Sequence, residues 1–521
     1  MKLLNNKNPL IIVQVEPPQT ADSGDYFYRT HAPGIAMAQD DNIYVINITN
    51  QHRRKAEMLS QADILILKNI CDPDILPLIK NRKKEGKLTV YEIADDLNAL
   101  QPWNPVYFFY KNEENLDLVH RLARSCDALQ ITCSELKRLY GRLNSNCEVF
   151  PNQILHDPYK RTLKSGMKIA VGWGGSHGHM EDMEEIVKPL SEWLIKQPNV
   201  FLHLMCSGPI WRLFDSLPDN KKRRTLPGTI DDYYKFLEGI DIGIAPMKNT
   251  AFNRSRSDVK FLEYAISGVV PVMVKLGSYR DSVDDGRTGF LFNNTIELID
   301  ILGRLIKDTA LMQKIKNNTQ LYVIRERQQL NHGQDRIIFY KSLLKQTESH
   351  NGRKNRGVEL FEELSKQEGA VRNKRHLQLL PTRFECLLHD GLLAMQVKGD
   401  KVLANRLFSE AITLEPENYL PFMFGSSLAI DPISSLINAI ELKPDSLKTW
   451  LLLGEEFEKR GKIVEALESY ESAANVYPEY ELPYSRVGTL LKKSGKQSES
   501  DWFIMKANEL KCNYISSLEI G

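Results

Sequence analysis

The chain has 521 residues, 42% of them hydrophobic and 26% charged, values typical of a water-soluble globular protein that is too long for a single core. Its 68 basic and 67 acidic residues nearly cancel, so no overall field favours nucleic acid or a membrane surface. Seven scattered cysteines without CxxC spacing argue against a zinc site or a disulfide framework, and we expect a reducing, cytoplasmic location.

The first part of the chain predicts a Rossmann-like lobe over residues 1–155. The apolar run Leu10–Val15 is too short for a signal peptide or a membrane span, so we expect a buried strand and at most peripheral membrane contact. Further strand candidates are Ile43–Ile48, Ile64–Leu67, Thr89–Ile93, Ala128–Thr132 and Glu148–Phe150. Amphipathic segments separate these runs, which predicts βα units around a parallel sheet.

The alternation restarts after a polar stretch and predicts a second Rossmann-like lobe over residues 156–346. The strand candidates are Lys168–Gly172, Phe201–Cys206, Ile240–Ala245, Val269–Val274 and Gly289–Phe292. Ligands of open α/β sheets bind beyond the carboxyl ends of the strands, so the chemistry is expected in the cleft between the lobes.

Residues 347–380 are charge-dense and are predicted to be a linker or an exposed helix. Residues 381–521 are predicted to be helical repeats of the tetratricopeptide type. Trp450, Gly454, Gly461 and Ala473 are matched 34 positions later by Tyr484, Gly488, Gly495 and Ala507. The gap from Pro416 to Pro444 is only 28 residues, so the repeat between them must be shortened or irregular. Such repeats bind protein partners or serve as a rigid arm, and the sequence leaves both open.

The segment that follows Ala245 carries the main binding signal. A strand ends there, a polar loop follows, and a helix is expected to begin near Ser257 or Asp258, either of which is a good N-cap. The free backbone N–H groups of the helix would then face the cleft and favour a phosphate.

Charged residues in this segment fit a nucleotide diphosphate. Lys260 opposes the helix dipole, a placement that a nearby anion would explain, and Arg254 and Arg256 add positive charge. Glu263 shares the face of Lys260 and can accept hydrogen bonds from ribose hydroxyls. The alternative is an ordinary surface pair of Lys260 and Glu263.

A glycine-rich turn follows the first strand of the second lobe. Gly174 and Gly175 allow close approach of a phosphate, and the Ser176 hydroxyl can donate to it. His177 or His179 could assist, although packing or capping explains either, and we favour that explanation for His177.

Residues 257–272, the glycine-rich turn and the loop 281–292 together resemble the donor-binding lobe of GT-B glycosyltransferases, especially the retaining family-4 enzymes of bacterial polysaccharide synthesis. The resemblance spans about residues 10–345, with specific motifs only in the second lobe. It implies that Lys260 contacts the donor diphosphate, where it would act in catalysis, and that Glu263 contacts the ribose.

The resemblance also extends to the loop that follows the first strand. Residues 28–34 resemble the first-lobe loop near the acceptor and the donor sugar, which makes Arg29 and His31 acceptor-side candidates. His31 could bind a sugar hydroxyl or shuttle a proton, a catalytic role. The pair Asp95 and Asp96 is assigned to acceptor contact or loop capping, with Asp96 the acceptor-side candidate. We expect no metal and no cofactor, because helix ends and basic residues neutralise the phosphates in this fold.

One position departs from the family pattern. Ser255 stands where the family often has a second glutamate, eight residues before Glu263, which puts the usual contact to the donor sugar in doubt. The basic residue that conventionally follows the glycine turn is also missing.

We therefore expect an enzyme that moves a hexose from a UDP- or GDP-linked donor to a saccharide, lipid-linked or protein acceptor, in surface polysaccharide or glycoconjugate synthesis. The main alternative is a catalytically inactive scaffold that binds sugar nucleotide or protein partners. A third possibility is a nucleotide-sugar epimerase. Nucleic acid is not an expected partner.

Overall fold

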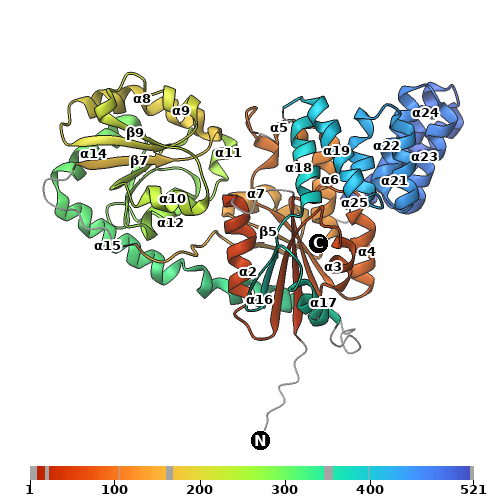
Figure 1. Ribbon diagram of the computed structural model, residues 1–521, viewed down its shortest axis with the longest axis horizontal. Helices are drawn as coiled ribbons and strands as arrows, with labels where there is room; N and C mark the ends of the chain where they lie inside the picture. Colours follow the sequence, from red (N-terminus) through yellow and green to blue (C-terminus); the bar gives the residue numbers. More distant parts are fainter. Residues whose placement is uncertain are drawn as a thin grey trace, which may run out of the picture.

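The computed structural model describes residues 9–17, 23–104, 106–159, 168–344, 356–396 and 398–516. Two Rossmann-like α/β lobes lie side by side, and a set of helical hairpins extends from the first lobe away from the second (Figure 1). The fold is therefore the expected pair of Rossmann-like lobes, in the GT-B arrangement, followed by an all-helical region.

The first lobe is built on an eight-stranded sheet of order β13-β14-β2-β1-β3-β4-β5-β6. Its first six strands are β1 (Leu10–Glu16), β2 (Ile43–Thr49), β3 (Ile64–Lys68), β4 (Leu88–Ile93), β5 (Ala128–Ile131) and β6 (Cys147–Val149), all at predicted places. They pair in parallel, and β1 lies centrally, with Val13 opposite Ile46 on β2 and Leu65 on β3. Such strands are apolar on both faces because helices cover both.

Helices connect these strands and cover the sheet. They are α1 (Gly24–Tyr26), the π-helical turn η1 (Phe27–His31), α2 (Ala32–Met37), α3 (Lys55–Gln61), α4 (Ile75–Lys84), η2 (Leu97–Ala99), α5 (Tyr107–Lys111), α6 (Glu113–Ser125), α7 (Ser134–Tyr140) and η3 (Gly141–Leu143). The segment after β1, predicted to be a loop, is thus helical from Gly24 to Met37.

The second lobe is built on a six-stranded sheet of order β12-β11-β10-β7-β8-β9. Its strands are β7 (Ile169–Gly174), β8 (Val200–Met205), β9 (Lys222–Thr225), β10 (Ile242–Ala245), β11 (Val270–Val274) and β12 (Phe290–Phe292). The charged edge strand β9 is absent from the predicted set, because its sequence lacks the apolar run on which the other strands were recognised.

Helices again fill the connections of the second sheet. They are η4 (His177–His179), α8 (Met180–Ile195), α9 (Gly208–Arg212), η5 (Asp219–Lys221), α10 (Ile230–Leu237), α11 (Ala251–Arg254), α12 (Val259–Ile266), α13 (Gly277–Ser282), α14 (Thr295–Lys307) and α15 (Thr309–Glu326).

Two chain segments cross between the lobes side by side. Ile154, on the way out, pairs with Gln328, on the way back: the Ile154 N–H donates to the Arg327 carbonyl at 2.9 Å, and the Gln329 N–H donates to the Ile154 carbonyl at 2.8 Å. After η6 (Gln329–His332), α16 (Gly333–Leu344) packs on the first lobe, where Ile337 and Tyr340 join its core. The helical end of the predicted second lobe therefore belongs spatially to the first.

The predicted charged linker is folded where the structure describes it. It forms α17 (Arg356–Leu364) and the hairpin of β13 (Ala370–Asn373) and β14 (His376–Leu379), and β14 pairs in parallel with β2. The expectation of a solvated linker is corrected here, because Phe361, Leu364 and Leu377 enter the first-lobe core between the charged residues.

The C-terminal helices form antiparallel pairs. They are α18 (Arg383–Gln396), α19 (Lys401–Leu414), α20 (Tyr419–Gly425), η8 (Ser426–Leu428), α21 (Pro432–Leu442), α22 (Leu447–Lys459), α23 (Ile463–Val476), α24 (Glu481–Lys493) and α25 (Gln497–Ser516). The unit between Pro416 and Pro444 has the short first helix expected for a reduced repeat. Gly454 lies where a Cβ would meet the Tyr470 ring at 2.5 Å, which explains a small residue at that repeat position. The tetratricopeptide identity of the repeats stays a prediction.

The repeats are docked onto the first lobe. Leu447 and Tyr470 share one core cluster with first-lobe residues, and the Lys448 N–H donates to Asp74 at 3.0 Å. In the part of the chain that the structure describes, no helix combines the length and the apolar character needed to cross a bilayer.

Candidate functional site

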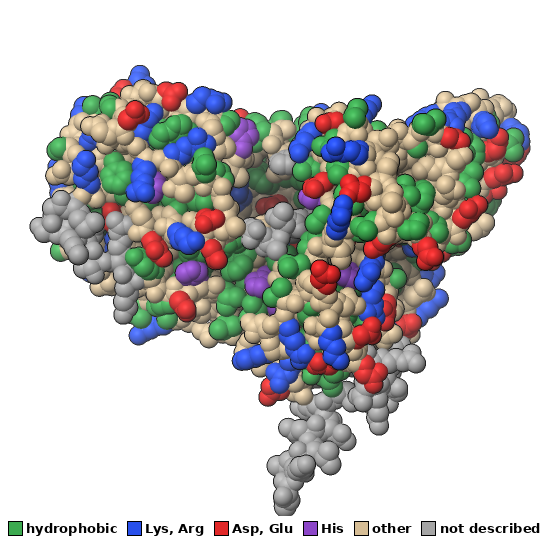
Figure 2. All heavy atoms as spheres, in the orientation of Figure 1, with side chains coloured by type: hydrophobic (Ala, Val, Ile, Leu, Met, Phe, Trp, Pro, Cys, Tyr) green, Lys and Arg blue, Asp and Glu red, His purple; other side chains and the backbone are tan. Residues whose placement is uncertain are grey.

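A cavity of about 570 Å³ lies between the two lobes, at the carboxyl ends of their strands. The molecular surface is visibly hollowed between the lobes (Figure 2). The volume of the cavity is in the range of small-molecule sites, and both lobes contribute residues to the cavity wall. The cavity is therefore the expected cleft.

Helix α12 presents its first turn to this cavity. It begins at Val259, as predicted, and Ser257, Val259, Lys260 and Glu263 line the wall. Asp258 precedes the helix, but its carboxylate does not cap it; instead it accepts from Arg327 at 2.7 Å. This ion pair ties the start of α12 to the crossing segment.

Lys260 is held against the glycine-rich turn. Its ammonium donates to the Gly174 carbonyl and lies 5.5 Å from the centre of the Trp173 ring. Burial lowers the pKa of Lys260 to about 8, with Glu263 opposing the shift and Arg256 adding to it. The side chain is thus a cation at neutral pH that is easily deprotonated.

Glu263 is only 6% exposed and accepts a hydrogen bond from the Tyr28 hydroxyl of the first lobe at 2.8 Å. Burial raises the pKa of Glu263, although Lys260 and Tyr28 lower it. The surface-pair alternative for Lys260 and Glu263 does not hold, because both side chains face the cavity and contact other elements.

Gly174, Gly175 and Ser176 all line the cavity. The Gly175 N–H donates to the Met205 carbonyl at 3.0 Å, so that group is already used within the sheet. A Cβ at Gly174 would come within 2.6 Å of Tyr233, and one at Gly175 within 2.5 Å of Trp173. The glycines therefore make room for two aromatic rings beside Lys260.

The two arginines of the preceding loop differ in position. Arg256 lines the cavity, whereas Arg254 is exposed, binds Asn249 at 2.8 Å, and does not line it. Ser255 is fully buried and donates to the Phe252 carbonyl at 2.8 Å. Its position supplies no polar group to the cavity.

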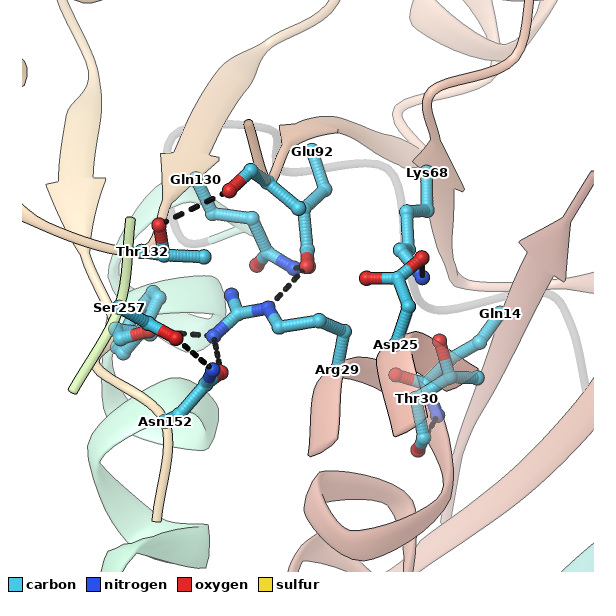
Figure 3. Close-up of polar contacts among 12 residues, drawn as sticks. Gln14, Asp25, Arg29, Thr30, Lys68, Glu92, Gln130, Thr132, Asn152 and Ser257 are labelled. Carbon is cyan, nitrogen blue, oxygen red and sulfur yellow. Dashed lines mark hydrogen bonds and ion pairs between the residues drawn. The ribbon is translucent and has the colours of Figure 1, made fainter. Parts of the chain in front are cut away.

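Arg29 anchors the first-lobe wall. It is 2% exposed, and its Nε lies 2.6 Å from the Glu92 carboxylate while its Nη1 donates to the Phe150 carbonyl and to Asn152 Oδ1, both at 2.8 Å. Figure 3 shows the contacts of Arg29 with Glu92 and Asn152, and the Asn152 side-chain amide in turn donates to the Ser257 hydroxyl at 2.9 Å. Arg29 therefore connects β4 of the first lobe to the α12 side of the cavity.

His31 and Asp96 do not line the cavity. The segment after β1 is helical, and within it Tyr28 and Arg29 line the cavity, whereas His31 packs on Phe27 with ring centres 5.7 Å apart. Asp96 caps η2 and accepts from the Tyr140 hydroxyl at 2.7 Å, the loop-capping alternative of its predicted role.

Sequence reasoning missed several residues of the cavity wall. Asp25 and Tyr28 come from the first lobe, and Thr229 and Tyr233 come from the second, whereas Asp95, one of the predicted acidic pair, also lines the cavity. Thr229 forms a capping box with Asp232, a spacing that is readable in the sequence. Asp25, Tyr28 and Tyr233 have no local sequence signal of their own.

His179 also lines the cavity, whereas His177 is exposed and does not. Burial and the charge of Arg256 lower the pKa of His179 to about 3, so the imidazole is neutral at physiological pH. Its Nδ1 lies 2.8 Å from the Asp182 carboxylate, which makes Nδ1 the protonated nitrogen and Nε2 an acceptor. No three His, Cys, Asp or Glu side chains gather as a potential metal site among the described residues.

Residues 172–308 match the family of glycosyl transferases group 1, a stretch that contains Gly174, Lys260 and Glu263. No curated protein matches the chain in sequence. Among solved structures, HepE of Anabaena with UDP-glucose is 16% identical, covering 64% of this chain and 100% of its own, with a TM-score of 0.47. Sucrose-phosphate synthase of Thermosynechococcus elongatus is 11% identical, covering 65% and 100%, with a TM-score of 0.49. MamA is 20% identical, covering 31% and 90%, with a TM-score of 0.25.

Proposed function

We propose that this protein is a glycosyltransferase that moves a hexose from a nucleotide-diphosphate sugar to an acceptor hydroxyl. The observation that carries the proposal is the placement of Lys260 and Glu263, one helical turn apart, in the wall of a cavity between two lobes. Both lie in the stretch that matches the glycosyl transferases group 1.

Lys260, Arg256 and the first turn of α12 form the diphosphate side of the proposed site. The two cations and the helix N-terminus all favour negative charge. Glu263 would accept from ribose hydroxyls, since a carboxylate can accept about four hydrogen bonds and Tyr28 uses only one of its oxygens.

In the transfer step, the bond between the anomeric carbon and the phosphate oxygen breaks, and its electron pair leaves with the diphosphate. The acceptor oxygen forms the new bond to the same carbon, and its proton passes to the released diphosphate. Lys260 and Arg256 stabilise the charge that develops on the leaving group. Retention at the anomeric carbon and independence of metal belong to the proposal and rest on the family resemblance.

The acceptor side of the proposal changes with the structure. Asp25 and Asp95, which line the cavity from the first lobe, replace His31 and Asp96 as the residues that would meet an acceptor. Arg29, an acceptor-side candidate from the sequence, also lines the cavity and is bonded there to Glu92. The acceptor would be a saccharide, lipid-linked or protein hydroxyl in surface polysaccharide or glycoconjugate synthesis, with a UDP- or GDP-linked donor, in the cytoplasm.

One observation favours a second candidate, a scaffold that binds sugar nucleotide without transfer. The family glutamate is replaced by Ser255, which is buried away from the cavity. Such a protein would bind nucleotide at Lys260 and Glu263 and leave the donor sugar unreacted.

Calorimetric titration with UDP and GDP tests the donor site before an acceptor is known. We expect one nucleotide to bind saturably, Glu263→Ala to weaken it about tenfold, and the exposed α8 residue change Glu192→Ala to leave it unchanged. Lys260→Ala should lose most transfer while staying folded. Binding without donor consumption by any acceptor would favour the scaffold, and a folded protein that binds neither nucleotide would remove both candidates.

A further inference from the structure

Tyr28, a first-lobe residue, contacts the proposed ribose-binding carboxylate across the cleft. It lies on the π-helical turn η1, is 5% exposed, and lines the cavity. Its hydroxyl donates to Glu263 Oε1 at 2.8 Å, although the two residues are separated by 235 positions and come from different lobes.

The direction of the hydrogen bonds around Tyr28 is fixed by its single proton. A phenol has one proton to donate, and that proton is used on Glu263. The Tyr234 hydroxyl, 3.1 Å from that of Tyr28, must therefore be the donor in their contact. The His156 ring stacks on the Tyr234 ring with centres 3.7 Å apart, and this contact restricts the orientation of Tyr234. Tyr28 is thus held with its proton aimed at Glu263.

We propose that Tyr28 is a positioning residue for the nucleotide: it holds the Glu263 carboxylate in the ionised form and orientation that accept ribose hydroxyls. The inference rests on the proposed function. Its consequence is that the donor site, although carried by the second lobe, is completed by a side chain of the first.

The electrostatic surroundings of Glu263 make this role measurable. The titratable groups that interact electrostatically with Glu263 are Lys260, Tyr28, Tyr233, Tyr234, Tyr264 and Tyr279, and the His156 ring stacks on Tyr234. Of these, only Lys260, Tyr28 and Tyr233 lower the pKa of Glu263. Burial raises the pKa of Glu263, and Tyr28 is one of the groups that lower it. Loss of the Tyr28 hydroxyl raises this pKa further, so the variant must lose nucleotide affinity faster as the pH falls.

The test is titration of UDP and GDP into the full chain and into Tyr28→Phe between pH 5.5 and pH 8. We expect Tyr28→Phe to weaken nucleotide binding about tenfold at pH 7. The dissociation constant of the variant divided by that of wild type should increase as the pH falls toward 5.5. Tyr264→Phe is the matched control. Tyr264 lies on α12 next to Glu263, but its buried hydroxyl donates to the Ile244 carbonyl at 2.9 Å, inside the second lobe. This variant should bind within twofold of wild type at every pH.

A nucleotide that lacks the ribose hydroxyls separates positioning from general damage. With the 2′,3′-dideoxy form of the bound nucleotide, Tyr28→Phe and wild type should bind equally, because the contact under test is missing in both. Two results would overturn the positioning role when wild type binds UDP or GDP. One is a ratio of the Tyr28→Phe and wild-type dissociation constants that does not change with pH. The other is a ratio that is as large with the dideoxy nucleotide as with the ribonucleotide. If folded wild type binds neither nucleotide, the proposed function fails, and this inference fails with it.

Discussion

Arg29 and Glu92 form an ion pair with its atoms 2.6 Å apart and side-chain exposures of only 2% and 1%. Burial raises the pKa of Glu92, but the positive charges of Arg29, Arg336 and Lys68 lower it by more, so the pKa of this carboxyl lies below its usual value. Arg29 lines the first-lobe wall of the cavity, so the shape of that wall depends on this almost fully buried charge contact.

Replacing Arg29 by Met should strongly destabilise the protein. The substitution leaves the Glu92 carboxylate buried with only weaker partners, so we expect the free energy of unfolding to fall by about 3 kcal/mol. Urea unfolding measures this. Arg138→Met is the control, since Arg138 pairs with Glu135 at the surface, and it should show no measurable change. Equal stability of the two variants would contradict the role given to the buried pair.

Nucleotide binding should weaken on the alkaline side because of Lys260. The pKa of this ammonium is lowered to about 8, so the cation is lost as the pH rises through that value. We expect the affinity for the bound nucleotide to fall about tenfold between pH 7.5 and pH 9. Lys260→Arg keeps its charge and should bind with little change over this range, whereas the exposed Lys188→Arg should behave as wild type. If the affinity of Lys260→Arg for the nucleotide also falls between pH 7.5 and pH 9, the titrating group is not Lys260.

Stability should fall between pH 5 and pH 8 because of Glu16. Burial raises the pKa of Glu16 to about 8, although Lys68 lowers it. A carboxyl whose folded pKa exceeds its unfolded one binds more protons when folded, so its contribution is complete below about pH 4.5 and is lost as the pH rises toward 8. Glu16→Gln should flatten this slope by at most about 1.4 kcal/mol per pH unit in urea unfolding. An unchanged slope in that variant would mean that Glu16 is ionised throughout.

The contact of Arg121 with the repeats should hold them to the first lobe. Arg121 lies on α6, pairs with Glu481 at the start of α24, and stacks 5.3 Å from the centre of the Tyr480 ring. Arg121→Met should speed hydrogen exchange in α24 while exchange in β7 of the second lobe stays unchanged. Lys83→Met, on the same face of the sheet but paired within the lobe, is the control. Unaltered exchange in α24 would show that apolar packing alone fixes the repeats.

The sequence predicted most of what local pattern determines. All strands of the two sheets except β9, β13 and β14 follow from apolar runs, and the start of α12 at Val259 and the placement of Lys260 and Glu263 on one face follow from capping and helical spacing. The Tyr28 contact could not be predicted, because it depends on how two lobes meet across 235 residues of chain.

Strand β14 was missed for a related reason. Its four residues are all buried, but charged residues surround them, and a short run becomes a strand here only because β2 offers an open edge to pair with. His31 was placed wrongly in the cleft because a helical turn, not a loop, follows β1.

The return of α16, α17 and β14 to the first sheet decides which parts of the protein travel together. The second lobe is inserted between two portions of one body, and the chain passes from one to the other and back through the paired segments at Ile154 and Gln328. The repeats are fastened to that same body. In any hinge motion of the crossing segments, α12 therefore moves with the second lobe, whereas the repeats keep a fixed distance from Asp25 and Asp95 of the first.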